Sequence, residues 1–328
     1  MAPKSNPPAA SAALTKAVRL RRVSVVANTA SGSVGLTAPR TVRALLEEFG
    51  LDPQIHAAIP GGDSLGDCLD KAFAAKPALV VGLAGDGTAR AAAERAGMHG
   101  PLIAPLPGGT MNMLPHAIYG QVKWPAALRA TLQDGEVRTL GGGEIDGHAF
   151  FVAAILGSPA LWADAREAAR AREHRKALLR AARALRRAFS GRLRYDLGGG
   201  LRGKAEALSL LCPVISAALD DDARALEAAA IDPHDARQAF RLAMHAIADD
   251  WRNDPAVDVG QCRHGRVWAS GRIPAILDGE PVRLGSGARI TYRPKACRVL
   301  APPAEAEAAP EGGLTRLSPL HLLRRPAV

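Results

Sequence analysis

Short apolar runs alternate with helical segments along the first part of the chain. An alternation of strand and helix is typical of a parallel sheet covered by helices. We therefore predict an α/β domain over residues 18–136. Its strands are expected at 22–27, 53–59, 78–83 and 101–106, and its helices at 38–49, 64–74 and 89–96.

The pattern changes after residue 136, where short alternating strands are separated by glycines. This pattern favours an antiparallel β-sandwich, which we predict over residues 137–300. A helical insert of one or two helices is expected at 161–194, because Ala, Leu and Arg dominate there and the first helix breaker is Gly191. Residues 1–17 and 302–328 are expected to be mostly flexible tails.

Charge indicates an anionic partner. The chain of 328 residues has a formal net charge of +10, which suits a nucleotide, a nucleic acid or a membrane with acidic lipids. An aromatic fraction of 4% and the lack of a recognition motif argue against nucleic acid. The insert 161–194 holds eleven Lys and Arg against three Asp and Glu. We expect this basic helix to make peripheral contact with an anionic membrane; the alternative is a solvated helix face.

The cysteines and the apolar stretches bear on location. The four cysteines contain no CxxC pair, so neither a zinc site nor a disulfide framework is predicted. Residues 1–17 lack the apolar core of a secretory signal. The longest apolar stretch, 207–219, is too short to cross a bilayer of about 30 Å. We expect a cytoplasmic protein that is peripheral at the inner face of the membrane.

Three small polar loops follow predicted parallel strands, at the sheet edge where α/β proteins bind ligands. Glycines let backbone N–H groups approach phosphate oxygens, and a following helix favours negative charge at its amino terminus. A triphosphate also needs Mg²⁺, which prefers carboxylate oxygens, so Asp86 is the candidate metal ligand. The loops are Asn28-Thr29-Ala30-Ser31-Gly32, Gly85-Asp86-Gly87-Thr88 and Gly108-Gly109-Thr110-Met111-Asn112.

Four motifs together resemble those of the diacylglycerol kinase catalytic family. Three resemble its nucleotide-binding signatures in order and spacing, and the fourth resembles its second-domain catalytic motif. The alternative for Asp278-Gly279 is a hairpin turn, for which Asp-Gly is a preferred pair. The motifs are Asn28-x-x-Ser31-Gly32, Gly85-Asp86-Gly87-Thr88, Pro107-Gly108-Gly109-Thr110-x-Asn112 and Leu277-Asp278-Gly279-Glu280.

The resemblance implies a fold and an activity. The expected fold is a Rossmann-like nucleotide domain of the NAD kinase and phosphofructokinase type, followed by a lipid-binding β-sandwich. The expected activity is ATP- and Mg²⁺-dependent phosphorylation of a lipid alcohol, with Asp278 as general base and Glu280 as a supporting acid. Nucleotide binding is carried over to Asn28, Ser31, Gly32, Gly85, Asp86, Gly87, Thr88, Gly108, Gly109, Thr110 and Asn112.

Departures from the family pattern define the alternatives. Arg90-Ala91 stands where the family has an Asn-Glu pair, which motivates a membrane-binding pseudokinase as one alternative. Met113 stands where diacylglycerol kinases have Asp, so ceramide or a sphingoid base is as open as diacylglycerol. An NAD kinase-like enzyme is a further alternative. The oligomeric state is also open, with a homodimer as one possibility.

Overall fold

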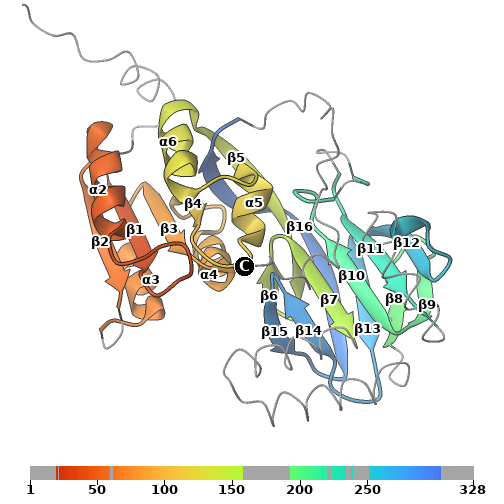
Figure 1. Cartoon of the computed structure of the whole chain (residues 1–328). Coiled ribbons are helices and arrows are strands. Elements are labelled where there is room, and N and C mark those ends of the chain that lie inside the picture. The colour runs from red at the N-terminus through yellow and green to blue at the C-terminus, as the bar shows by residue number, and fades with distance from the viewer. Residues whose placement is uncertain are drawn as a thin grey trace, which may run out of the picture. The chain divides into compact units, whose positions relative to one another are not determined.

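The computed structural model describes residues 20–303 apart from 21, 60–61, 158–192, 217, 220–222, 234–237 and 239–250. The chain divides into two compact units (Figure 1). The first comprises Met1–Leu140 with Lys295–Ala308, and the second comprises Gly141–Pro294 with Ala309–Val328. The chain therefore returns to the first unit at Lys295, whereas the sequence interpretation kept residues up to 300 in the second domain. The reason is a parallel pairing of Val299 with Ile103.

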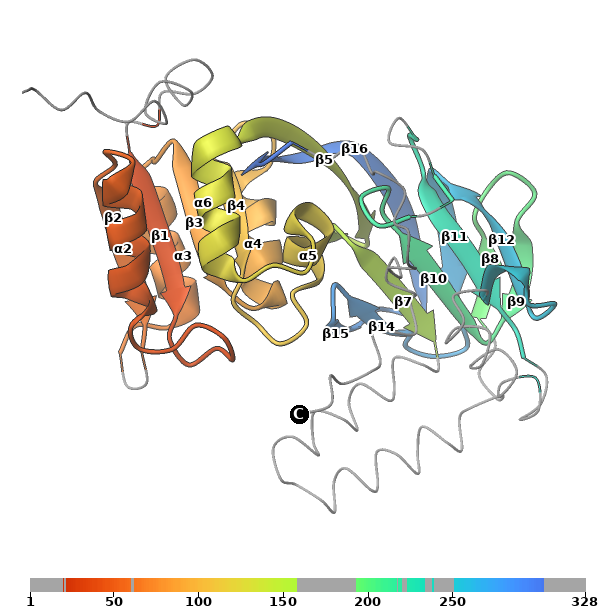
Figure 2. The same ribbon diagram turned by 45° about the horizontal axis from the view of Figure 1, so that its top comes forward.

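The first unit contains a parallel sheet with strand order β2-β1-β3-β4. Helices α2 and α6 pack on one face, where their apolar residues join those of the strands in a single core, and α3 and α4 cover the other face (Figure 2). The strands are β1 (Val23–Asn28), β2 (Pro53–Ala58), β3 (Leu79–Ala84) and β4 (Leu102–Pro107), and the helices are α2 (Ala38–Glu48), α3 (Leu65–Ala74), α4 (Asp86–Ala96), α5 (Met113–Tyr119) and α6 (Trp124–Asp134).

Two helix starts show how the sequence sets these boundaries. Helix α3 begins after Ser64, whose Oγ accepts a hydrogen bond from Asp67 N at 3.1 Å, while the Asp67 carboxylate accepts one from Ser64 N at 3.1 Å. This reciprocal capping satisfies two backbone donors. Helix α4 begins at Asp86, three residues before the expected start, with extended Gly85 as its N-cap. The second polar loop is thus the first turn of a helix.

The register of the parallel strands sets the position of the site. Ala27 of β1 pairs with Leu83 of β3, and Ala84 of β3 pairs with Pro107 of β4. The three strands therefore end at the same level of the sheet. The polar loops that follow them leave from one edge.

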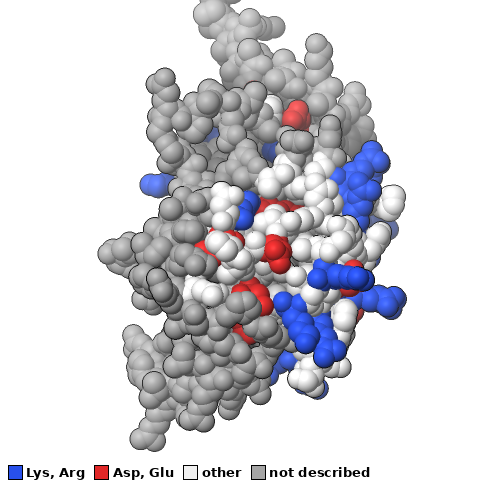
Figure 3. Space-filling view, turned by 90° about the vertical axis from the view of Figure 1, so that its right-hand side faces the viewer, with Lys and Arg blue, Asp and Glu red and all other residues white. Residues whose placement is uncertain are grey.

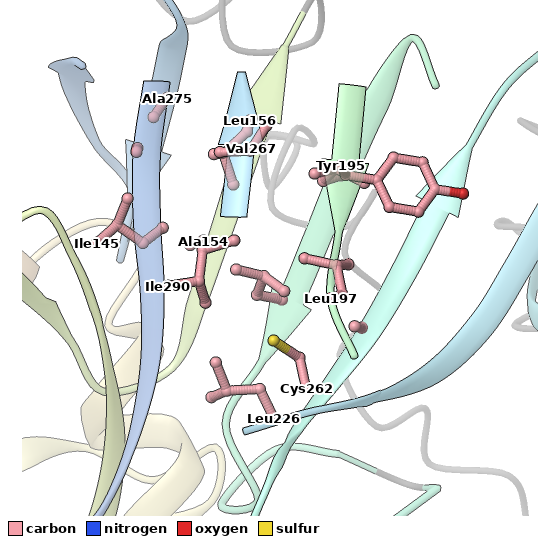
Figure 4. Packing of buried hydrophobic residues seen from close by; sticks show 14 of the residues in the cluster. Ile145, Ala154, Leu156, Tyr195, Leu197, Leu226, Cys262, Val267, Ala275 and Ile290 are labelled. Atoms are coloured by element: carbon pink, nitrogen blue, oxygen red, sulfur yellow. The ribbon is translucent and has the colours of Figure 1, made fainter. Parts of the chain in front are cut away.

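The second unit is an antiparallel sandwich, as predicted. One sheet has the order β12-β11-β10-β7-β14-β15, and the other runs β16-β13-β8-β9 with β5 and β6 beside β16. Apolar side chains from both sheets form its core (Figure 4). The elements are β5 (Glu136–Ile145), β6 (His148–Phe150), β7 (Ala153–Gly157), β8 (Leu193–Asp196), β9 (Arg202–Ala205), β10 (Ala207–Leu211), β11 (Leu226–Ile231), η1 (Trp251–Asn253), β12 (Val257–Cys262), β13 (His264–Trp268), β14 (Pro274–Leu277), β15 (Glu280–Arg283) and β16 (Gly287–Ala301).

The predicted helical insert 161–194 needs one correction. Leu193 and Arg194 lie in strand β8, because Leu193 faces the sandwich core and both residues pair with β9. The rest of the insert lies outside the described residues, as do the predicted tails apart from Pro302 and Pro303. No helix among the described residues combines the length and the apolar character needed to cross a bilayer. The four cysteines are buried free thiols.

Candidate nucleotide site and candidate catalytic carboxylate

The first loop begins where β1 ends at Asn28. The Asn28 Oδ1 accepts a hydrogen bond from Ala30 N at 3.1 Å, and Ser31 N donates to Asn28 O at 3.0 Å, so the side chain and the backbone of Asn28 both close the turn. Thr29 Oγ1 donates to Ala58 O at 3.0 Å, which ties the loop to the end of β2. Asn28 therefore shapes the first loop as a local turn residue.

The first loop is joined to the third by two serine hydroxyls. Ser31 Oγ donates to Gly108 O at 2.7 Å, and Ser33 Oγ donates to Pro107 O at 3.2 Å. These bonds connect segments more than 70 residues apart in the sequence. Ser31 is therefore a structural link between two candidate phosphate loops.

The second and third loops touch through glycines. A Cβ atom added to Gly109 would lie 2.6 Å from the Cα atom of Gly85, and one added to Gly108 would lie 2.7 Å from Ala84 N. Neither Gly108 nor Gly109 has a positive φ. These positions need glycine because two backbones approach closely, which is one of the standard uses of this residue.

Asp86 and Asn112 complete the connection between these loops. The Asp86 carboxylate accepts a hydrogen bond from Met113 N at 2.5 Å, at the start of α5, where a negative charge is favourable. Asn112 is left-handed, with φ 52° and ψ 44°. Its Oδ1 accepts from Gly109 N at 2.6 Å and its Nδ2 donates to Gly109 O at 3.0 Å, so its side chain fixes the third loop.

The surface of this cluster suits an anion. Gly32 and Thr110 are exposed, and Gly85, Asp86, Gly87 and Gly109 are partly exposed, whereas Thr88 and Asn112 are buried. Helix α4 starts among these loops and has no side-chain cap. Uncapped N–H groups at a helix amino terminus, beside glycine backbone that a ligand can approach closely, can bind phosphate oxygens.

Asp86 is the candidate metal ligand among the residues of the three loops. Across the described residues, no three His, Cys, Asp or Glu side chains gather closely enough to form a metal site among themselves. Mg²⁺ in phosphoryl-transfer sites is commonly held by one or two carboxylates together with substrate phosphates and water. One carboxylate at the phosphate loops fits that donor set.

Asp278 lies in the second unit, in the two-residue turn between β14 and β15. Asp278 and Gly279 have φ values of 49° and 86°, as a type I′ hairpin turn requires, so the turn alternative from the sequence is confirmed. The side chain does more than form the turn. Its Oδ2 accepts from Phe151 N at 2.8 Å, and its Oδ1 accepts from Val152 N at 2.9 Å and Ala153 N at 3.0 Å.

Asp278 is buried beside a cysteine thiol. Asp278 is only 2% exposed, and the neighbouring Cys212 is buried. Burial raises the pKa of the Cys212 thiol well above its ordinary value, and the charge of Asp278 raises it further. Glu280, by contrast, is exposed at the start of β15. Three N–H donors stabilise the ionised form of the buried carboxylate and fix its position.

Sequence reasoning found the loop residues but missed the groups that connect them. The missed groups are the hydroxyl of Ser33 and the backbone N–H groups of Met113 and of residues 151–153. The Ser33 hydroxyl could have been identified from the sequence, because Ser33 directly follows Ser31-Gly32. The backbone groups could not, because any residue type supplies an N–H.

Comparisons with known proteins bear on the family and on the fold. Residues 22–144 match the family model of the diacylglycerol kinase catalytic domain, which is a domain of phosphotransferases. No curated protein matches the chain. A diacylglycerol kinase structure from Bacillus anthracis str. Sterne is 14% identical with a TM-score of 0.60, over 87% of this chain and 98% of that chain.

Two further structures from that organism, provisionally assigned as diacylglycerol kinases, are similar in fold. One is 17% identical with a TM-score of 0.65, and the other is 15% identical with a TM-score of 0.64. Each match covers 87% of this chain and 99% of the other. At such identities the structures show a shared fold, and the family model gives a similarity over residues 22–144. Residues 22–144 are therefore similar to the catalytic domain of the diacylglycerol kinase family.

Proposed function

We propose that this chain is an ATP-dependent lipid kinase that transfers the γ-phosphoryl group to the hydroxyl of a long-chain lipid. One observation carries the proposal: the three loops of the family's nucleotide signatures are bonded together around the start of α4. Ser31 is bonded to Gly108, Gly85 is packed on Gly109, and Asp86 is bonded to the start of α5. A connected cradle of this kind suits a triphosphate.

In phosphoryl transfer a protein contributes mainly by positioning the reactants and by neutralising the charge on the phosphates. The backbone N–H groups of Gly85 and Gly87 are proposed to bind phosphate oxygens. Gly109, whose own N–H is bonded to Asn112 Oδ1, is proposed to let the phosphates approach the third loop closely, while Gly32 and Thr110 present the exposed side of the cradle. Asp86 is the proposed ligand of Mg²⁺, which would neutralise charge on the phosphates when bound.

Asp278 is the proposed acceptor of the proton from the lipid hydroxyl. An alcohol is a weak nucleophile at neutral pH, so a fixed carboxylate close to it promotes attack on the phosphorus atom. The three N–H bonds to Asp278 support this role because they fix the position of the carboxylate. Glu280 is the proposed supporting acid. The acceptor is proposed to be diacylglycerol, ceramide or a sphingoid base, met at the inner surface of the membrane.

The test incubates the purified full chain with γ-labelled ATP, Mg²⁺ and, separately, diacylglycerol, ceramide, sphingosine and NAD. Label in one lipid product is expected. Label only in phosphorylated NAD would make the chain an NAD kinase-like enzyme. ATP binding without any labelled product would make it a pseudokinase.

The assignment of Asp278 has a matched control in the same unit. Asp146-Gly147 forms the same kind of turn, with φ values of 46° and 83°, and Asp146 is exposed with its carboxylate bonded to Arg289 N at 2.8 Å. Asp278→Asn is expected to lower kcat by about 10²–10⁴-fold, the usual contribution of a general base, with unchanged ATP affinity. Asp146→Asn is expected to keep wild-type turnover. Similar turnover in the two variants would disprove the base assignment.

A further inference from the structure

The sheet β16-β13-β8-β9 of the second unit has one face in the core and one in solvent. Leu193 and Tyr195 of β8, Val267 of β13 and Ile290 of β16 belong to the core, and Figure 4 shows three of them in the packed interior. The residues that alternate with them are exposed. This alternation is the normal consequence of the two-residue period of a strand.

The exposed side of this sheet is strongly basic. We define the basic sheet face by its exposed cationic residues and the tryptophan among them. The pairing places Lys204, Arg194 and Trp268 side by side in one row across β9, β8 and β13. The next row runs from Arg202 through Asp196 and Arg266 to Arg289. The basic sheet face comprises Arg194, Arg202, Lys204, Arg266, Trp268 and Arg289.

The basic sheet face holds like charges at positions where they repel. Arg194 lies directly opposite Lys204, and Arg266 lies directly opposite Arg289. Such pairs destabilise a sheet, because paired side chains are only about 5 Å apart. Within the ranges that the structure describes, none of these basic side chains forms an ion pair. The acid in the second row, Asp196, accepts a hydrogen bond from Gly198 N at 3.2 Å.

An exposed tryptophan accompanies this charge. Trp268 is 40% exposed, whereas Trp124 and Trp251 are buried. A surface indole is suited to the boundary between lipid headgroups and acyl chains. Figure 3 looks onto the end of the second unit where β8 and β9 lie, and Lys and Arg side chains gather there along the right-hand edge of the view.

We propose that the basic sheet face docks on a membrane surface that contains anionic phospholipid. Lipid phosphates would relieve the repulsion between the opposed basic pairs, and Trp268 would insert at headgroup level. A nucleic-acid partner is less well matched, because binding of bases uses several aromatic platforms and this face has one. The proposal does not depend on kinase activity, since vesicle binding without ATP tests it.

The experiment measures co-sedimentation of the full chain with vesicles of phosphatidylcholine, with and without phosphatidylglycerol. Arg194→Gln/Lys204→Gln removes one opposed pair. Arg40→Gln/Lys123→Gln removes the same charge from exposed positions of the first unit. Each basic residue near an anionic surface contributes about fivefold to binding, so the first variant should bind about 30-fold more weakly than the control. Binding should be lost at about 1 M salt, where the Debye length is about 3 Å.

Trp268→Phe supplies a second measurement that does not depend on charge. Brominated phosphatidylcholine in the vesicles is expected to quench tryptophan fluorescence in the wild type, and a smaller fraction is expected to be quenched in Trp268→Phe. Equal vesicle binding by the two charge variants, or quenching that is unchanged by Trp268→Phe, would overturn the proposal. Loss of duplex DNA binding in Arg194→Gln/Lys204→Gln, with vesicle binding intact, would instead identify a nucleic-acid surface.

Discussion

The contact between Gly85 and Gly109 gives the sharpest test of the nucleotide cradle. In Gly109→Ala the new methyl group would lie 2.6 Å from Gly85 Cα and 3.3 Å from Asn112 Oδ1. Gly85 Cα is backbone and cannot rotate away, so the second and third loops must separate. Overpacking of this kind costs about 1–3 kcal/mol. At about 2–4 °C per kcal/mol, the melting temperature should fall by about 2–12 °C.

Separation of the loops should also weaken nucleotide binding. A hydrogen bond to a charged group contributes about 1.5–3 kcal/mol, so loss of one bond to phosphate lowers affinity by about 10- to 100-fold. Titration calorimetry with Mg²⁺ and a non-hydrolysable ATP analogue measures this change, and thermal unfolding measures the stability.

Gly82→Ala is the matched control for Gly109→Ala. Gly82 lies in β3, three residues before Gly85, and a Cβ atom there would meet nothing within 4 Å. The same substitution should therefore leave both stability and nucleotide affinity close to wild type. If Gly109→Ala behaves like Gly82→Ala in both measurements, the second and third loops do not form a shared cradle.

Two further predictions concern stability. The Glu227 carboxylate is 1% exposed and lies 2.6 Å from the Arg252 guanidinium. Arg252→Leu leaves this buried carboxylate without its cation, so the free energy of unfolding measured with denaturant should fall by about 3–5 kcal/mol. Arg129→Leu, which breaks an exposed pair with Glu48, should cost under about 1 kcal/mol, and equal costs would contradict the argument. Burial lowers the pKa of His116 below its ordinary value of 6.5. As the pH falls through 6.5, the imidazole therefore binds a proton in the unfolded chain before it does so in the folded chain, and the folded state loses stability. Between about pH 7.5 and 5.5 the melting temperature of His116→Gln should therefore fall by less than that of the wild type. An equal fall in the two proteins would contradict a lowered pKa for His116.

Most elements of the first unit could be predicted from the sequence, because apolar runs and helical segments there are short, regular and separated by turns. The start of α4 could not be placed correctly. Its first turn, Asp86-Gly87-Thr88, has a glycine and two poor helix formers, so propensity places it in a loop. The turn is helical because Gly85 caps it and Asp86 is anchored to the start of α5.

Strand β16 shows a second limit. It runs from Gly287 to Ala301 and belongs to both units, with Pro294 near its middle. Proline inside an apolar run normally argues against a continuous strand, because it cannot donate to the ladder. The strand nevertheless continues through Pro294, and the pairing of Val299 with Ile103 that returns the chain to the first unit could not have been read from the sequence.

Asp278 and Asp146 show why the candidate catalytic residue could not be separated from a turn residue by sequence. Both precede glycine, both are left-handed, and both close two-residue hairpins. They differ in what surrounds them: Asp146 is exposed, whereas Asp278 is buried against the backbone of residues 151–153, more than 120 positions away in the chain. Asn or Gly would serve the turn equally well, and a buried charge is costly unless it is fully bonded. A carboxylate at position 278 is therefore explained by its charge and its three N–H partners, and the turn alone does not require it.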